Sequence, residues 1–310
     1  MKPVLLTGAT GFIGQHLQKT LLADQTGVVA IIRPTSSHKD ALQPGAGSLL
    51  ARLDDSEKLA PALTEASAVI YCAGSVRGRC LDDFAPANID GVRSMVNAMN
   101  ETGAQTPLLL ISSLAASRPH VSDYANSKYL GEQEVIGHAR FPWSIFRPPA
   151  VYGPGDKEML PILKLARKGT IAPPGPVNQR LSLIHVSDVA TAALAWLKSW
   201  KSCDKKIFTL DDGHSGGYDW HEIAITASPA GYRRINIPHW LLASAGAVSL
   251  AVSHVFRFSP IFTPGKVREL TQTDWVCHNT ELSEATGWAP EIDLEQGIED
   301  LFGPAAEQQE

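Results

Sequence analysis

The N-terminal residues join an apolar run, a glycine-rich turn and the start of a helical pattern, which limits the folds open to this chain. The run at 4–6 leads into Gly8, Gly11 and Gly14, three residues apart. Gly8 permits a tight turn, Gly11 lets the backbone approach a pyrophosphate, and Gly14 lets helix and strand pack closely. Amides at a helix start also attract anions. We predict a site for dinucleotide phosphates, the alternative being a turn without a ligand; its residues are Gly8, Thr10, Gly11, Phe12, Ile13 and Gly14.

Apolar runs alternate with helical patterns through the first half of the chain. Strands are expected near 3–7, 28–32, 48–52, 68–72, 107–112 and 143–147, and helices near 12–24, 57–65, 82–100 and 123–139. Strands that alternate with helices predict right-handed crossovers and a parallel sheet. We therefore expect an α/β fold with a doubly wound parallel sheet of the Rossmann type. Its ligand is expected at the carboxyl ends of the strands.

The pattern changes after residue 147, because seven prolines interrupt the stretch 148–176. Farther along we expect a strand at 181–186, a helix at 189–199 capped by Ser187 and Asp188, and a last strand at 207–210. This organisation predicts two lobes. The dinucleotide-binding domain takes 1–152 and 181–212, a smaller, mostly helical substrate lobe takes 153–180 and 213–303, and 304–310 is expected to be a flexible tail.

Composition argues against several other classes of protein. The 310 residues carry a net charge of -5 with both signs spread along the chain, so we expect no surface for nucleic acid. The four cysteines have no paired spacing and the histidines form no H-x-x-x-H motif, so we expect free thiols and no metal site. A strand is expected from residue 3, which leaves no signal peptide and predicts a cytoplasmic protein. The oligomeric state stays open.

The end of the second expected strand bears on which dinucleotide is bound. An NAD site usually carries an acidic residue about 20 residues beyond the glycines, which binds the ribose 2′-hydroxyl. Here Arg33 follows the strand, and Thr35, Ser36 and Ser37 come next without a carboxylate. A guanidinium pairs with a 2′-phosphate, and hydroxyls add hydrogen bonds. These residues favour NADP(H), with Arg33 and Ser36 as contacts; the alternative is that Arg33 is an ordinary surface residue.

Tyr124 and Lys128 form a Tyr-x-x-x-Lys pair in the helix expected at 123–139. A helix places residues four apart on one face, and an ammonium group beside a phenol favours the phenolate, since the phenol's ordinary pKa is about 10. Ser112 and Ser113 end the preceding strand. This set predicts carbonyl reduction, in which Tyr124 protonates the oxygen and Ser113 polarises it, with Ser112 as second candidate. The alternative is a solvated tyrosine and lysine.

Taken together, these motifs resemble those of the extended short-chain dehydrogenase/reductase family, which is similar to NAD-dependent epimerases and dehydratases. The matching segments are 7–14, 71–74, 88–91, 112–113, 124–128, 147–154 and 183–190. The resemblance implies that Ala73 and Gly74 lie near the nicotinamide ribose, that Lys128 binds this ribose, and that backbone around Pro148 lies beside the nicotinamide. The substrate-cleft residues implied by the same resemblance are Arg147, Tyr152, Arg180 and His185.

Some of these implied roles have alternatives in the sequence. His185 can instead be a hydrogen-bonded core residue, and Tyr152 can be packing alone. Where the family often has an Asp that contacts adenine, this chain has Arg52, which then faces the phosphate or solvent. Only ten residues separate Ser113 from Tyr124, a short loop for the family, which predicts an open mouth to the active site.

Three features bear on the substrate. The segment 113–115 reads Ser-Leu-Ala where the family's dehydratases have Thr-Asp-Glu, which argues against dehydration, and Arg33 argues against the tightly bound NAD of epimerases. The region 240–262 is apolar, whereas a sugar diphosphate needs arginines and polar donors. We therefore expect NADPH-dependent reduction of a hydrophobic 3-oxo substrate. The alternatives are an NAD-dependent sugar-nucleotide epimerase and a non-catalytic dinucleotide-binding subunit.

The resemblance extends to a subgroup of bacterial reductases, on the segments 112–116, 148–156, 211–213 and 263–270. This subgroup includes the bacterial ceramide reductase, which implies a lipid substrate, 3-ketodihydroceramide, and a role in sphingolipid synthesis. The apolar stretch 240–256 is too short for a convincing bilayer span. It either packs in the second lobe or, within 240–262, contacts the inner face of the membrane, where Arg233, Arg234 and Arg257 can meet lipid head groups.

Overall fold

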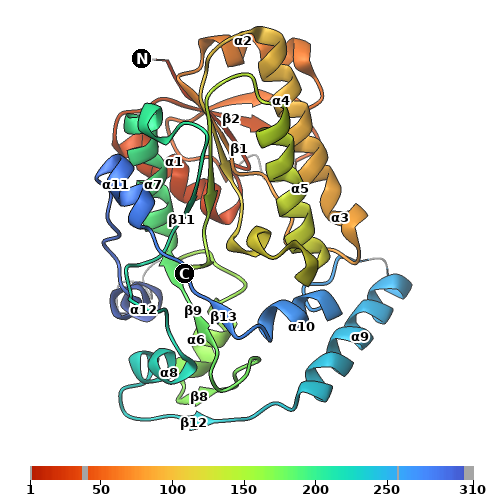
Figure 1. The fold of residues 1–310 in the computed structure, drawn as a ribbon, viewed down its shortest axis with the longest axis vertical. Helices are drawn as coiled ribbons and strands as arrows, with labels where there is room; N and C mark the ends of the chain where they lie inside the picture. Colours follow the sequence, from red (N-terminus) through yellow and green to blue (C-terminus); the bar gives the residue numbers. More distant parts are fainter. Residues whose placement is uncertain (1, 37–40, 257, 304–310) are drawn as a thin grey trace.

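The computed structural model describes residues 2–36, 41–256 and 258–303, so Ser37, Arg257 and the tail 304–310 lie outside the described residues. Seven parallel strands form one sheet in the order β11-β6-β5-β4-β1-β2-β3 (Figure 1). They are β1 (Val4–Thr7), β2 (Val28–Ile32), β3 (Gly47–Leu50), β4 (Ala68–Tyr71), β5 (Leu108–Ile111), β6 (Trp143–Arg147) and β11 (Lys206–Thr209). The predicted doubly wound sheet is confirmed. Strand order reverses between β1 and β4, and ligands of such sheets bind beside the reversal.

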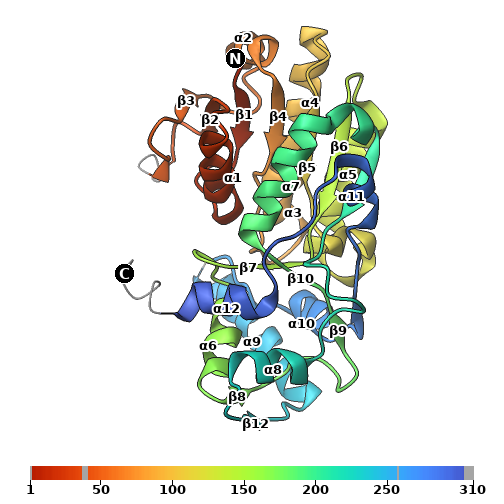
Figure 2. The same ribbon diagram turned by 90° about the vertical axis from the view of Figure 1, so that its left-hand side faces the viewer.

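Helices cover both faces of this sheet (Figure 2). One layer contains α1 (Phe12–Ala23) and α7 (Val186–Ser199), and the other contains α2 (Ser56–Glu65), α4 (Gly91–Thr102) and α5 (Asp123–His138). A separate buried cluster of apolar side chains lies under each layer. The helix α11 (Thr280–Thr286), although late in the chain, packs beside α7 and adds Leu282 to the first cluster.

The helix predicted at 82–100 is divided. It consists of α3 (Leu81–Ala85), a π-helical turn at Pro86–Asp90 and α4. Proline lacks the amide donor of a regular helix, and π turns widen the backbone locally. The turn carries Asn88, whose side-chain amide donates to the Ser75 carbonyl at 3.0 Å and to Ser127 Oγ at 2.8 Å. This turn therefore ties the end of β4 to α5.

The prediction of a single strand at 181–186 is wrong. Two short strands occur there, β9 (Arg180–Leu181) and β10 (Leu183–His185), and neither joins the large sheet. β10 pairs with β7 (Ala150–Tyr152), and β9 pairs with β13 (Asp274–Trp275). The short runs are separated by Ser182, whose hydroxyl donates to the Cys277 carbonyl at 3.2 Å.

The predicted cap of the following helix is also wrong, because α7 begins at Val186 rather than at 189. His185 is the cap, and its Nδ1 accepts the Ser187 amide at 3.4 Å. The Asp188 carboxylate is buried and accepts the amides of Glu291 at 3.1 Å and Ile292 at 3.0 Å. Asp188 therefore holds a distant segment of the chain against the first turn of α7.

A second body of structure lies beyond the carboxyl ends of the strands (Figure 1). Its buried cluster joins residues of α6 (Leu160–Arg167), α8 (Trp220–Ala227) and α12 (Leu294–Phe302), with β8 (Thr170–Ile171) and β12 (Arg233–Arg234) at its edge. Its remaining helices are α9 (His239–Phe256) and α10 (Pro264–Leu270). The two-lobe boundaries given above stay a prediction.

The helix α9 stands at the periphery of this second body, and α10 packs along it (Figure 1). Only Gly246 and Ser253 of α9 are buried, so this is not a core helix. Within the described residues, α9 alone has the length and apolar composition of a membrane span, with a mean hydropathy of 1.3. Its 18 residues span about 27 Å, slightly less than the hydrocarbon core of a bilayer.

Candidate active site

The glycine turn is packed so closely against neighbouring backbone that Gly8 and Gly14 have no room for a side chain. Gly8 has a φ of +67°, and a Cβ there would lie 2.6 Å from the Ala73 amide nitrogen. A Cβ on Gly14 would lie 2.0 Å from the Gly8 carbonyl oxygen, and the Gly11 amide donates to that oxygen at 3.0 Å. A side chain at Gly8 or Gly14 would therefore collide with backbone. This close packing at the start of α1 fits the phosphate site that the sequence predicts.

The ends of β1 and β4 are joined next to this turn. Thr7 Oγ1 accepts the amides of Cys72 and Ala73, both at 3.1 Å. Gly74 follows, and a Cβ there would lie 3.7 Å from Lys128 Nζ. The predicted cofactor residues at the two strand ends are thus neighbours, and Lys128 approaches them from α5.

Ser122 holds the start of α5, where Tyr124 lies. Ser122 Oγ accepts the Ala125 amide at 3.0 Å and caps the helix. The Tyr124 ring packs edge-on against Phe84 with centroids 5.9 Å apart. Burial raises the pKa of Tyr124, while its interaction with the Ser113 side chain opposes that change. Tyr124 and Ser113, which sequence analysis placed in one set, therefore line the same cavity.

Lys128 is buried, and its ammonium donates to the Ile111 carbonyl at 2.9 Å. Burial lowers its pKa to about 8, although the charges of Cys72 and Glu132 act in the opposite direction. The sequence predicts Lys128 as the cation that acts on the Tyr124 phenol. In the structure the Lys128 ammonium is directed to the end of β5, and the charge of Lys266 on α10 acts to lower the pKa of Tyr124.

The neighbouring hydroxyls of Ser112 and Ser113 have different surroundings. Ser112 Oγ donates to Glu132 Oε1 at 2.5 Å, inside the core. Arg147 completes this buried group, since its Nε donates to the same oxygen at 2.9 Å and its Nη2 donates to Oε2 at 2.5 Å. Among the described residues, Ser113 has no such carboxylate partner, and its Oγ accepts the Ala115 amide at 3.2 Å. Both serines line the large cavity, so the choice of Ser113 stays a prediction, which the engagement of the Ser112 hydroxyl by Glu132 supports.

The four residues implied for the substrate cleft do not line the large cavity in the structure, so their roles stay a prediction that this cavity does not support. Arg147 is held by Glu132, and the buried Tyr152 donates to the Asp293 carbonyl at 3.1 Å. Arg180 donates to the Gly217 carbonyl at 2.8 Å on the surface. His185 is a buried helix cap whose pKa burial lowers to about 4.

A cavity of about 760 Å³ extends from the start of α1 to α9 and α10, and Ser113, Tyr124 and Pro148 line it. Much of the remaining wall is apolar: Phe12, Ile13, Phe84, Leu114, Met159, Ile162, Leu181, Trp220, Leu250, Ile261, Phe262 and Trp275. A pocket of this size and lining suits a large hydrophobic ligand with a few polar contacts.

The residues expected to select the cofactor lie at the ends of β2 and β3. Arg33 and Thr35 are exposed, and the Ser36 amide donates to the Arg33 carbonyl at 2.9 Å. Arg52 pairs with Asp54 in two hydrogen bonds, of 2.8 and 2.7 Å. The sequence left two orientations open for Arg52, toward the phosphate or toward solvent, and this exposed ion pair agrees with the second.

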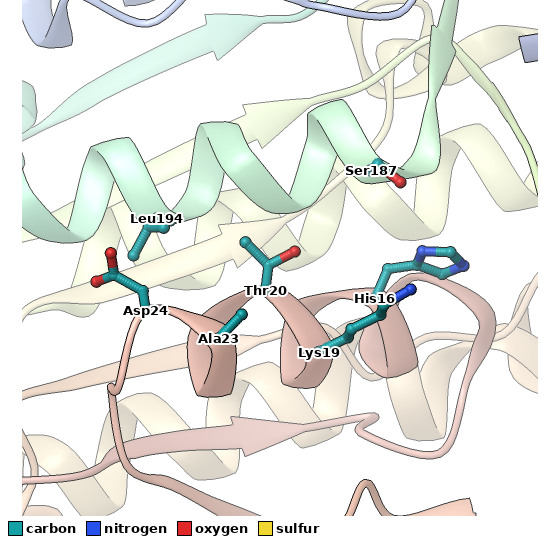
Figure 3. A pocket seen from close by; sticks show the side chains of 7 residues that line it. All are labelled: His16, Lys19, Thr20, Ala23, Asp24, Ser187 and Leu194. Carbon is teal, nitrogen blue, oxygen red and sulfur yellow. The ribbon is translucent and has the colours of Figure 1, made fainter.

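A smaller hollow lies between α1 and α7 in one helix layer (Figure 3). It is lined by His16, Lys19, Thr20, Ala23, Asp24, Ser187 and Leu194. Asp24 is paired with Lys198 at 2.6 Å. The hollow contains none of the predicted site residues, so the candidate active site is the cavity at the strand ends.

Comparison with known proteins agrees with this geometry. Residues 4–209 match the profile of the NAD dependent epimerase/dehydratase family. The chain belongs to this family, and the resemblance to extended short-chain dehydrogenases/reductases is confirmed. It is an oxidoreductase that binds a nicotinamide dinucleotide.

Individual relatives include reductases and an epimerase. A ceramide reductase of Caulobacter vibrioides (strain NA1000 / CB15N) is 34% identical over 91% of this chain and 88% of its own length. A 2-alkyl-3-oxoalkanoate reductase of Stenotrophomonas maltophilia (strain K279a) is 27% identical over 68% of this chain and 70% of its own. The UDP-glucose 4-epimerase structure from Thermotoga maritima has a TM-score of 0.74 at 19% identity, covering 99% of this chain and 100% of its own, which shows the shared fold.

Proposed function

We propose that the protein is an NADPH-dependent reductase of a hydrophobic 3-oxo substrate, with 3-ketodihydroceramide as the leading candidate. The observation that carries this proposal is the large apolar cavity with Ser113 and Tyr124 in its wall. The similarity to a ceramide reductase and a 3-oxoalkanoate reductase supports the same substrate class.

The proposed chemistry divides among three side chains. NADPH supplies a hydride when bound. Tyr124 gives a proton to the carbonyl oxygen, and Ser113 donates a hydrogen bond to that oxygen as charge develops on it. Lys128 holds the nicotinamide ribose beside Gly74 and Pro148. The apolar wall excludes water and holds the chain of the substrate.

The substrate is tested by measuring NADPH oxidation with N-hexanoyl-3-ketosphinganine in detergent and with UDP-glucose. Turnover of the first and not of the second is expected, and Tyr124→Phe is the control for non-enzymatic oxidation. Epimerisation of UDP-glucose, with NAD released when the purified protein is denatured, is the result that favours the epimerase alternative. Binding of the dinucleotide without turnover of either substrate favours a non-catalytic dinucleotide-binding subunit.

We propose NADP(H) over NAD(H) on the basis of Arg33. It is exposed at the end of β2, beside β1, where a 2′-phosphate can meet its guanidinium. The test is the ratio of KM values for NADH and NADPH before and after Arg33→Ala. The preference for NADPH is expected to fall by about tenfold or more, since a charge-assisted bidentate contact is lost. An unchanged ratio contradicts this assignment.

We also propose that α9 contacts the surface of an anionic lipid bilayer. No Asp, Glu, Lys or Arg lies between 235 and 256, and the outward side chains Trp240, Val248 and Val255 are 68%, 61% and 75% exposed. Arg233 and Arg234 precede this apolar surface, and such a combination suits an interfacial helix. Leu250, on the inward side, lines the cavity, so the substrate pocket lies directly behind the proposed contact.

Flotation with phosphatidylglycerol vesicles tests this contact. Trp240→Glu and Val255→Glu are expected to abolish flotation, while Ile225→Glu on α8, at a site 42% exposed, leaves it intact. Circular dichroism checks that each variant is folded. Equal flotation of all four proteins, or a dimer that Val255→Glu dissociates, overturns the lipid assignment.

A further inference from the structure

The helix α10 is attached to the start of α5, close to Tyr124. Glu269 is buried, and its carboxylate accepts a hydrogen bond from the Ser122 hydroxyl that caps α5. The Arg268 side chain donates to the Val121 carbonyl at 2.9 Å. A Cβ on Gly265 would lie 3.2 Å from Ser122 Cβ, so the two segments pack closely. Groups on α10 are therefore held in a defined position beside the phenol.

Charged groups of both signs meet at this end of the cavity. Lys266 Nζ pairs with Glu269 Oε2 at 3.1 Å, and the lysine side chain is 34% exposed where it lines the cavity. Glu158 lines the same space and pairs with Arg77 at 3.6 Å. Burial raises the pKa of Tyr124 most; the charges of Glu269 and Glu158 act in the same direction, and the charge of Lys266 acts against them. All three charges therefore act on the reacting phenol.

This arrangement suits an uncharged polar ligand. A carboxylate beside Lys266 would meet an ammonium already paired with Glu269, and would be repelled by Glu269 and Glu158. A hydroxyl or an amide can accept from the ammonium and donate to a carboxylate without adding charge. The apolar wall beyond requires that the rest of the ligand be hydrophobic.

We propose that Lys266 and Glu269 form a polar subsite that holds an uncharged hydroxyl or amide group next to the substrate's 3-oxo group and selects against 3-oxo acids. This inference rests on the proposed reduction of a hydrophobic 3-oxo substrate. It assigns a specificity role to the segment 263–270, which the reduction chemistry leaves without one.

Turnover of three ketones of matched chain length tests the subsite: N-hexanoyl-3-ketosphinganine, a 3-oxo fatty acid and a plain methyl ketone. Lys266→Met is expected to lower the ratio of kcat/KM for the first ketone to kcat/KM for the methyl ketone about tenfold, since one charge-assisted hydrogen bond to the substrate is lost. Loss of the Lys266 charge also raises the pKa of Tyr124, but that change acts on all three ketones alike and cancels in the ratio. Glu269→Gln keeps an acceptor for Ser122 but unpairs the ammonium. It is expected to shift the ratio of acid to amide turnover about tenfold toward the acid. Lys164→Met, on the exposed face of α6, is the control.

Two results overturn the subsite: wild-type protein that prefers the 3-oxo acid, or a Lys266→Met variant that loses turnover equally on all three ketones. Binding separates this failure from failure of the proposed reduction. Trp220 and Trp275 line the cavity, so quenching of tryptophan fluorescence reports binding without turnover. If no ketone is reduced, the reduction proposal fails, and tighter binding of N-hexanoylsphinganine than of palmitate, lost in Lys266→Met, still supports the subsite. Equal binding of the two lipids contradicts it.

Discussion

Helices α5 and α9 have similar lengths, 16 and 18 residues, but the polar helix α5 is largely packed inside the protein whereas the apolar helix α9 is largely exposed. α5 is rich in polar residues, yet Ser127, Lys128 and Glu132 are buried. α9 contains no Asp, Glu, Lys or Arg, yet only Gly246 and Ser253 are buried. Polarity alone therefore does not decide which helix lies inside this protein.

Hydrogen-bond partners explain the difference. In α5, the Ser127 hydroxyl donates to the Tyr124 carbonyl, Lys128 donates to the Ile111 carbonyl, and Glu132 accepts from Ser112 and Arg147. Buried polar groups are tolerated when they are paired, and breaking a pair is costly. α9 has no charged side chain that needs such a partner, and its outward apolar face is exposed in the structure. The comparison predicts that changes in α5 have large effects and that changes on the outer face of α9 have small ones.

Removing the Tyr124 hydroxyl is expected to have the largest effect. Tyr124→Phe should lower kcat by about a thousandfold, since general acid catalysis is lost, with the Kd for NADPH within about threefold. Tyr129→Phe, five residues later in α5, is the control and should retain kcat. Stopped-flow turnover and fluorescence titration measure both quantities. Normal turnover by Tyr124→Phe would remove α5 from the chemistry.

The two neighbouring serines should respond differently. Ser113→Ala is expected to lower kcat by about a hundredfold, since one donor to the developing oxyanion is lost. It should cost no more than about 1 kcal/mol of stability, since its hydroxyl also accepts the Ala115 amide at 3.2 Å. Ser112→Ala removes a partner of the buried Glu132 and should destabilise the fold by about 1–3 kcal/mol with a smaller loss of kcat. Urea unfolding and kinetics separate these outcomes. The reverse pattern would exchange the two assignments.

A matched pair of valines tests the contrast in packing directly. Val135 of α5 is fully buried, whereas Val255 of α9 is 75% exposed. Val135→Ala should lower the free energy of unfolding by about 2 kcal/mol, through lost burial and a small cavity. Val255→Ala should change it by less than about 0.5 kcal/mol. If urea unfolding shows that Val255→Ala lowers the free energy of unfolding as much as Val135→Ala, α9 packs against another molecule, such as a second copy of the chain.

The pH dependence of cofactor binding gives the smallest expected effect. Burial lowers the pKa of Lys128 to about 8, so its ammonium is charged below that pH and neutral above it. If Lys128 holds the ribose, affinity for NADPH should fall about tenfold between pH of about 7 and about 9.5. Fluorescence titration measures this, and Lys128→Met should bind weakly with a flat profile. A wild-type profile as flat as that of the variant would argue against the ribose contact.

Local sequence predicted most of the nucleotide-binding half. The glycine turn, the alternation of strands and helices, and the order of Ser113, Tyr124 and Lys128 all depend on residues close together in the chain, where turn geometry and helical periodicity act. The same reasoning failed at 181–186 and at the cap of α7. There the backbone of Leu181 pairs with Trp275, and the Asp188 carboxylate accepts the Ile292 amide. Both partners lie far away in sequence, so no local pattern reveals them.

The sequence by itself thus determined the class of fold and the order of the groups along the strand ends, because propensity and periodicity act over a few residues. Only the tertiary structure decided that Glu132 takes the Ser112 hydroxyl, that Arg147 pairs with the same buried carboxylate, and that Lys266 comes from α10 to the cavity of Tyr124. Those outcomes depend on which side chains compete for a partner in a closed space, and such competition exists only after distant segments have packed together.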